Sequence, residues 1–257
     1  PISDSLDGIE ELAKIAAEKK LKVFVGYQNR FHPGIQYLKQ FLAEGSIGRI
    51  LSVRSVVGER LTTMHTYENY KDTYMARKDM GGGVLLNQCP HQLDLWQWIC
   101  GMPSKVQSFM KFGKWHDIEV EDDVTTYVEY PNGATGVFIT TTGDGCGTNR
   151  FEVQMDGAKL VVENDQLRVW EFAEKEQDFS KTNKVPFGQL PSKEIEVETD
   201  GKNPQHAGVL NAWAGAILRG TPLVANGAEG INGLTISNAM HLSAFTGKMV
   251  ELPLDED

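Results

Sequence analysis

Two hairpin patterns in the middle of the sequence constrain the fold more than any other feature. Apolar and polar residues alternate over residues 124–130, the turn residues Pro131-Asn132-Gly133 follow, and residues 134–142 return with the same alternation. A second pair of alternating runs is joined by Asp156-Gly157. A period of two, interrupted by such turn residues, is typical of antiparallel strands. The sequence therefore predicts an open, largely antiparallel sheet.

Helical patterns flank these strands on both sides. Apolar residues fall at helical spacing between residues 6 and 16, after a possible cap at Ser3, and again over residues 35–42 and 91–100. Two more helical patterns lie near the C-terminus and end at Gly220 and Gly247. An antiparallel sheet with helices gathered on one face is an α+β domain.

The first helical pattern is followed by a short apolar run, residues 22–27, which is rich in residues that favour strands. A helix followed by a buried strand is half of a βαβ unit, and such a strand needs parallel neighbours. Nothing later in the sequence repeats this alternation. We therefore expect the neighbouring strands to lie before Pro1 or on another chain.

Composition excludes several classes of partner. The formal net charge is −10 and no run of Lys or Arg occurs, which disfavours nucleic acid. No apolar stretch is long enough to span a membrane. The three cysteines show no CxxC spacing, as expected for a reduced, cytoplasmic protein. Metal binding is disfavoured, because Cys89, His91 and Asp94 lie too close together along the chain and lack a fourth ligand.

Residues 77–94 hold the densest set of candidate functional groups. Gly81, Gly82 and Gly83 permit a sharp reversal and close approach of the backbone to a ligand, although a purely structural turn explains them as well. Asn87, His91 and Asp94 are spaced to share one helix face. A histidine with a nearby carboxylate suits proton transfer from a hydroxyl, and the alternative is a half-buried histidine that braces the helix.

From Val25 onward the chain resembles the glucose–fructose oxidoreductase, inositol dehydrogenase and rhizopine catabolism (Gfo/Idh/MocA) family. The motifs that carry the resemblance occur in the family's order over nearly the whole chain. They are residues 27–33 (YQNRFHP), 44–50 (EGSIGRI), the glycines 81–83 through His91 to Asp94, residues 133–136 (GATG) and the tail at 240–253.

The resemblance implies that the complete protein binds NAD or NADP on a Rossmann domain and moves a hydride between the nicotinamide and a sugar, cyclitol or related polyol. His91 matches the family's catalytic histidine. Pro1 is similar to the proline of a Glu-Lys-Pro motif, whose lysine would directly precede it. The implied domains are a remnant of the dinucleotide-binding domain at residues 1–28 and a catalytic domain at residues 29–257, and the chain alone is expected to be inactive.

Asn87 departs from the family pattern, which has aspartate at that position. Asn can hydrogen-bond a substrate hydroxyl but cannot support a cationic imidazole as a carboxylate can. The resemblance therefore implies that His91 and Asp94 share the acid–base work, or that the substrate brings a charge of its own.

Further residues are implied in binding, each with a plainer alternative as a surface charge, surface histidine or structural salt bridge. The implied cofactor-binding residues are Asn29, Arg30 and Arg77, and the implied substrate-binding residues are Tyr74, Lys78 and His206. Two other functions stay open, an NAD-dependent glycosidase of the same family and a sugar-binding or regulatory module without catalysis. Apolar residues on both sheet faces favour a homodimer or homotetramer formed through the open sheet.

Overall fold

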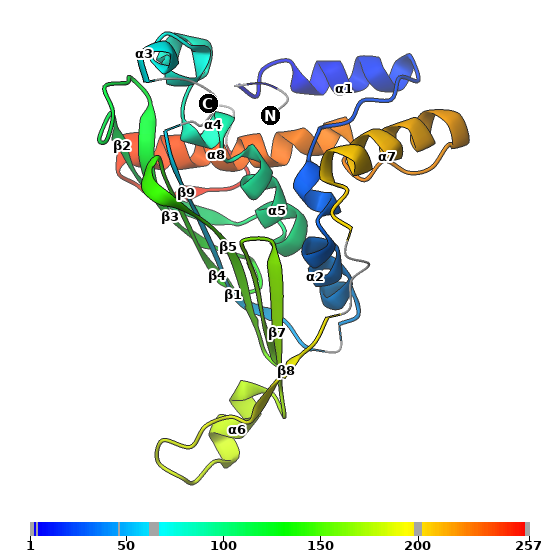
Figure 1. Cartoon of the computed structure of the whole chain (residues 1–257), viewed down its shortest axis with the longest axis vertical. Coiled ribbons are helices and arrows are strands. Elements are labelled where there is room, and N and C mark those ends of the chain that lie inside the picture. The colour runs from blue at the N-terminus through cyan, green and yellow to red at the C-terminus, as the bar shows by residue number, and fades with distance from the viewer. Residues whose placement is uncertain (1–2, 4, 46, 62–66, 198–201, 255–257) are drawn as a thin grey trace.

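The computed structural model describes residues 3, 5–45, 47–61, 67–197 and 202–254. Pro1, the expected end of a Glu-Lys-Pro motif, lies outside the described residues. The chain is an α+β structure in which helices gather on one face of an open sheet, as the hairpin patterns predict (Figure 1). Among the described residues no helix has the length and apolar character needed to cross a membrane.

Over the described ranges the sheet has nine strands in the order β8-β7-β6-β5-β1-β4-β3-β2-β9. Every pairing is antiparallel except that of β1 with β4, which is parallel. The strands are β1 (Ile50–Arg60), β2 (Lys105–Phe112), β3 (Glu121–Glu129), β4 (Thr135–Thr141), β5 (Gly143–Met155), β6 (Ala158–Glu163), β7 (Gln166–Phe172), β8 (Ser192–Ile195) and β9 (Val250–Glu251). The fold is thus a mixed, largely antiparallel sheet.

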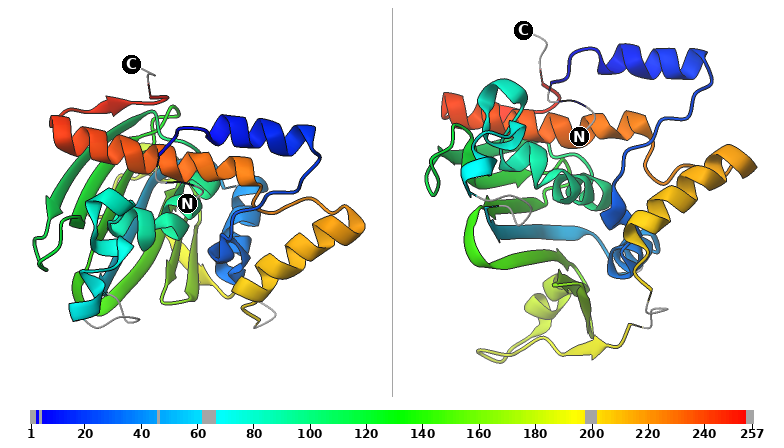
Figure 2. Two further views of the ribbon diagram at one scale, coloured as in Figure 1. Left: turned by 90° about the horizontal axis from the view of Figure 1, so that it is seen from above. Right: turned by 45° about the horizontal axis from the view of Figure 1, so that its top comes forward.

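Most ends of the longer helices lie where the sequence pattern predicts them. Gly220 and Gly247, which follow the two C-terminal helices, both adopt the left-handed conformation with φ of 71° and 67°. Figure 2 shows α8 lying across the strands while α7 extends away from the sheet. The helices are α1 (Ile9–Glu18), α2 (Pro33–Ala43), α3 (Tyr67–Tyr70), α4 (Val84–Asn87), α5 (Pro90–Cys100), α6 (Glu176–Thr182), α7 (Gln205–Arg219) and α8 (Gly230–Thr246), with short 3-10 turns η1 (Gln28–Phe31), η2 (Tyr74–Ala76), η3 (Lys78–Met80) and η4 (Gly227–Glu229).

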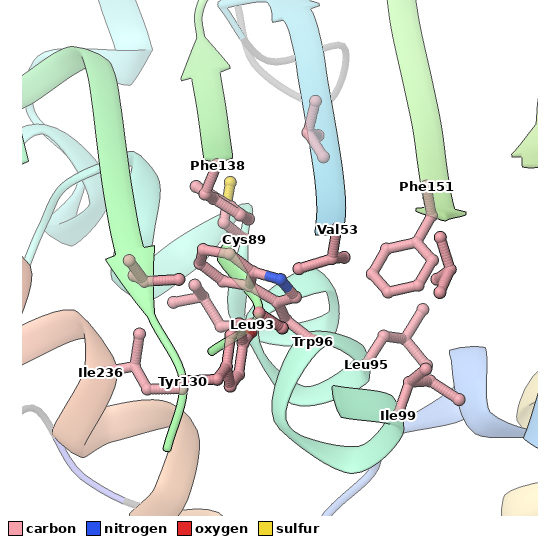
Figure 3. Close-up of a cluster of buried hydrophobic side chains, with 14 of the residues drawn as sticks. Val53, Cys89, Leu93, Leu95, Trp96, Ile99, Tyr130, Phe138, Phe151 and Ile236 are labelled. Carbon is pink, nitrogen blue, oxygen red and sulfur yellow. The ribbon is translucent and has the colours of Figure 1, made fainter. Parts of the chain in front are cut away.

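The core lies between the sheet and α5. The indole of Trp96 stacks on Phe138 of β4 with ring centroids 5.4 Å apart, and both residues are fully buried. A side chain at Gly136 would overlap Trp96, because an added Cβ would stand 2.7 Å from the indole. Figure 3 shows Trp96 among Val53, Leu93 and their neighbours. This close packing fixes α5, and with it the residues at its start, against the sheet.

The N-terminal segment contradicts one expectation and leaves a second one untested. The first helix begins at Ile9 rather than near Ser3, because Gly8 precedes it with a φ of 73°. Within the described residues the run 22–27 forms no strand, and Phe24 makes an isolated bridge with Asn226. Its parallel neighbours were expected before Pro1 or on another chain, so this strand stays a prediction. A strand exists only where hydrogen-bonding partners extend along it, and among the described residues this run has one short partner segment.

Candidate functional site

The three consecutive glycines form a tight turn that leads into α4. The amide of Gly82 donates to the carbonyl of Arg77 at 3.0 Å, and that of Gly83 donates to Met75 at 2.9 Å. Gly83 has a φ of 116°, and a Cβ there would overlap the carboxylate of Glu121. Both the backbone conformation and the close approach require glycine at this position. We call residues 81–83 the glycine turn.

Glu121, at the start of β3, supports the glycine turn with its side-chain carboxylate. Its side chain is 2% exposed, and Oε1 accepts a hydrogen bond from the amide of Leu85 at 3.0 Å. Oε2 lies 3.5 Å from Nε2 of His241 on α8. Sequence patterns did not single out Glu121 or His241, because the two lie far apart in the chain. The run Glu121-Asp122-Asp123 at the start of a strand was an available signal, since three acidic residues are unusual there.

Asn87 braces the same turn from the end of α4. Its Nδ2 donates to the carbonyl oxygens of Gly81 at 3.3 Å and Gly83 at 3.0 Å. Within the described part of the chain the hydrogen bonds of Asn87 use only its nitrogen, which leaves the side-chain oxygen available to a ligand. Asn87 therefore links the shape of the glycine turn to the helix that follows.

His91 lies in the first turn of α5, which begins at Pro90. Its ring meets the buried ring of Tyr27 edge to face, with centroids 6.2 Å apart. Burial lowers the pKa of His91 to about 4, and nearby His206 contributes in the same direction. The buried Nδ1 has no hydrogen-bond partner among the described residues. His91 is therefore neutral at pH 7 and keeps one ring nitrogen unpaired within the described part of the chain.

Asp94 does not pair with His91, in contrast to the expectation from helical spacing. Its carboxylate receives two hydrogen bonds from Arg30, from Nε at 2.8 Å and Nη2 at 2.6 Å, and a third from Gln97 at 2.9 Å. Burial raises the pKa of Asp94, and the guanidinium of Arg30 opposes that shift. The carboxylate is thus fully engaged within the interior.

Arg30 is 0% exposed, which differs from the expected cofactor-facing position. Its Nη1 also binds Glu229 at 2.7 Å and the carbonyl of Val224 at 2.6 Å, and its guanidinium carbon lies 5.4 Å from the centroid of the Tyr27 ring. Arg30 therefore links η1, α5 and η4. It also contacts the ring of Tyr27, which in turn meets the ring of His91. Arg30 thus takes part in a structural salt bridge, which was the alternative to cofactor binding in the sequence analysis.

The remaining predicted residues lie on several different elements. Tyr74 is exposed, and Arg77 pairs with Asp79 at 2.6 Å. His206 is exposed at the start of α7, and its influence on the pKa of His91 indicates that the two rings are near each other. Asn29 is half-buried in η1, next to Arg30.

A cleft of about 440 Å³ opens on the side of the glycine turn that faces α8. Glu121 and His241 contribute to its wall, and Lys78 is the one predicted binding residue that lines it. We call it the α8 cleft. Its lining residues are Lys78, Gly81, Gly82, Leu86, Phe112, Glu119, Val120, Glu121, Asn238, His241 and Phe245.

The middle of the chain matches a known protein family. Residues 35–161 match the GFO/IDH/MocA C-terminal domain. That segment contains the glycine turn, Asn87, His91 and the strands from β1 to β5, with part of β6.

The relatives of similar sequence include two dehydrogenases. The chain is 26% identical over 138 residues to trans-1,2-dihydrobenzene-1,2-diol dehydrogenase of Bos taurus, covering 54% of the chain and 38% of that protein. It is 24% identical over 163 residues to D-xylose dehydrogenase of Paenarthrobacter nicotinovorans, covering 63% of the chain and 38% of that protein. The matched region thus spans less than half the length of these relatives.

Solved structures share the fold over the whole chain. The WlbA dehydrogenase of Chromobacterium violaceum, in complex with NADH and UDP-GlcNAcA, superposes with a TM-score of 0.79 and 25% identity. The match covers 99% of this chain and 70% of that one.

Proposed function

Residues 35–161 form a GFO/IDH/MocA C-terminal domain, which makes the chain a member of that oxidoreductase family, and we propose that the complete protein is an NAD(P)-dependent dehydrogenase of a sugar, cyclitol or related polyol. One observation carries the proposal. Within this domain His91 is neutral, stands at the head of a rigid helix, and keeps a buried nitrogen without a partner among the described residues. The dehydrogenase relatives support the reaction class.

In the proposed reaction His91 acts on the proton of the reacting hydroxyl. A neutral imidazole can accept that proton while the carbon bearing the hydroxyl loses its hydride, so that the alcohol becomes a carbonyl. The nicotinamide, when bound, supplies the hydride acceptor, or the donor in the reverse direction. Tyr27 fixes the imidazole plane through its edge contact, and Asn87 orients the substrate hydroxyl through its free side-chain oxygen.

Arg30 and Asp94 have a positioning role in this proposal. Their ion pair holds α5, and therefore His91, against η1. Asn29 and Arg77 are proposed to bind the cofactor, while Tyr74, Lys78 and His206 are proposed to bind the substrate. The exposure of Tyr74, Arg77, Lys78 and His206 is compatible with ligand contact.

Replacing His91 tests the assignment in the complete protein. We expect His91→Ala to lower kcat by about 100-fold or more while the unfolding temperature changes little. The matched control is His116→Ala, which removes another half-buried histidine, in the β2–β3 connection, and should leave kcat unchanged. Wild-type turnover in His91→Ala would refute the role of His91.

The product distinguishes the two alternative functions. Release of the leaving group from a nitrophenyl glycoside without net NADH formation would favour an NAD-dependent glycosidase. Sugar binding that is independent of cofactor, without any turnover, would favour a binding or regulatory module. Net NADH formation from a polyol supports the dehydrogenase.

We further propose a homodimer or homotetramer formed through the outer face of the sheet. Phe109 is 65% exposed and Tyr127 is 37% exposed on neighbouring strands of that face. Light scattering of Phe109→Asp in the complete protein should report a smaller assembly than the wild type. We also propose a cytoplasmic location, which the free thiols of Cys89, Cys100 and Cys146 support.

A further inference from the structure

The ion pair between Glu121 and His241 has no role in the reaction proposed for His91. The two side chains differ in their access to solvent, since that of Glu121 is 2% exposed and that of His241 is 21% exposed. Both line the α8 cleft. A change in the pH of the solution therefore reaches the pair through the imidazole of His241.

The hydrogen bonds of His241 show where a proton must lie. Nδ1 is 2.9 Å from the carbonyl oxygen of Ser237, so Nδ1 carries a proton, because a carbonyl oxygen can only accept. In a neutral ring Nε2 would then present a lone pair to Oε2 of Glu121, 3.5 Å away, and the two acceptors would repel each other. The contact is favourable only when a proton lies between Nε2 and the carboxylate.

The charges around the pair favour a protonated imidazole. Lys78 and Glu119 also line the α8 cleft, and the backbone amide of Lys78 donates to Glu119 at 3.3 Å. The phenol of Tyr70 is near Glu121 and stays neutral, since burial raises its pKa to about 12. Over the described ranges Glu121 is the one charged side chain within 4.0 Å of His241. Burial lowers the pKa of His241, but Glu121 outweighs burial, so the pKa is raised above its ordinary value.

Glu121 connects this pair to the start of α4. Gly83 precedes the helix and has no side chain to cap it, and Oε1 of Glu121 accepts the amide of Leu85 in the first helical turn instead. The same carboxylate lies against Gly83, where even a Cβ would overlap it. The position of Glu121 therefore sets the position of the glycine turn and of α4.

Asn87 depends on the same turn for its own position. Its backbone amide donates to the carbonyl of Gly83 at 3.2 Å, and its Nδ2 donates to the carbonyls of Gly83 and Gly81. A continuous series of contacts thus runs from His241 through Glu121 and Gly83 to Asn87.

We propose that His241 is a positioning residue, whose Nε2 proton holds Glu121 against the glycine turn and thereby sets the position of Asn87. Loss of that proton to solvent leaves a buried carboxylate facing a lone pair, and the turn shifts to relieve this contact. The effect on turnover rests on the proposed function, because Asn87 is there proposed to orient the substrate hydroxyl. The effect on Asn87 itself does not depend on any reaction.

Solvent exchange of the Nδ2 protons of Asn87 tests the inference without substrate or cofactor. The rate is measured by NMR in the complete protein labelled with ¹⁵N-asparagine, and Asn87→Ser identifies the signal. His241→Gln serves as the reference, because its amide can donate to Glu121 but cannot titrate. We expect equal rates where His241 is protonated, and exchange about tenfold faster in the wild type once the pH rises above the pKa of His241.

A control variant and an opposite variant sharpen this comparison. His116→Gln changes another half-buried histidine and should follow the wild type at every pH. His241→Leu leaves Glu121 without a proton donor on α8 and should show fast exchange across the whole range. A constant ratio between wild type and His241→Gln would overturn the inference, even if the protein oxidises polyols.

Turnover gives the second readout. Relative to His241→Gln at the same pH, we expect kcat/KM of the wild type to fall by about tenfold as His241 loses its proton. A pH-dependent exchange ratio in a protein that oxidises no polyol would support the positioning of Asn87 by His241 and refute the dehydrogenase. The two proposals can therefore fail separately.

Discussion

The buried ion pair between Arg30 and Asp94 gives the sharpest stability prediction. Asp94→Ala removes the acceptor of two hydrogen bonds from a guanidinium that is 0% exposed. Arg30 cannot be deprotonated in a folded protein, so its charge stays buried. Breaking a buried pair by removing one partner costs about 3–5 kcal/mol. Since Glu229 still binds Nη1 at 2.7 Å, we expect a loss of about 3 kcal/mol, at the lower end of that range.

Urea unfolding at pH 7, followed by circular dichroism, measures this loss directly. For a chain of this length about 3 kcal/mol corresponds to a fall in Tm of roughly 6–12 °C. The double variant Arg30→Met, Asp94→Leu should recover most of the loss, because an apolar pair of similar volume removes the unpaired charge. A loss below about 1 kcal/mol for Asp94→Ala would refute the assignment of this pair as the support of α5.

Two further predictions concern the histidine and the glycine turn. Burial holds the pKa of His91 at about 4 in the folded chain. Between pH 6.5 and pH 4 the unfolded chain therefore binds a proton that the folded chain does not. The free energy of unfolding should fall by about 3 kcal/mol over this range. Urea unfolding of His91→Gln should lack that part of the pH dependence, and an identical profile would contradict it. In the same assay Gly83→Ala should lower the free energy of unfolding by about 2–4 kcal/mol, because the new Cβ overlaps Glu121. The control Gly133→Ala, with open space around its Cβ, should lower it by about 1–2 kcal/mol. Equal losses for the two variants would contradict the overlap.

Local patterns predicted the elements whose formation depends on local chemistry. The hairpin of β3 and β4 follows from alternation around Pro131-Asn132-Gly133, and α5 ends at Gly101 as its sequence predicts. Apolar character does not specify a hydrogen-bonding partner, so the strand at residues 22–27, whose neighbours were expected outside this chain, stays a prediction. The parallel pairing of β1 with β4 was not predicted for the same reason.

In the candidate site, too, local spacing predicted the segments that hold the residues but not the contacts between distant residues. Helical spacing predicted that Asn87, His91 and Asp94 share one helix face, but Asn87 ends α4 while the other two lie in α5, and Asp94 pairs with Arg30 rather than with His91. Arg30 lies 64 residues earlier and reaches the carboxylate only in the folded chain. Glu121 and His241 likewise meet across the sheet and α8, so no local pattern could connect them.

The most direct test of the central claim is transfer of label from substrate to cofactor. The complete protein is incubated with NAD or NADP and polyols deuterated at the hydroxyl-bearing carbons, and the recovered nicotinamide is analysed by mass spectrometry. The account predicts one deuterium in the reduced nicotinamide, and none after His91→Ala because turnover is lost. Oxidation of the polyol without deuterium in the nicotinamide, or no reduction with any polyol, would contradict hydride transfer as the function.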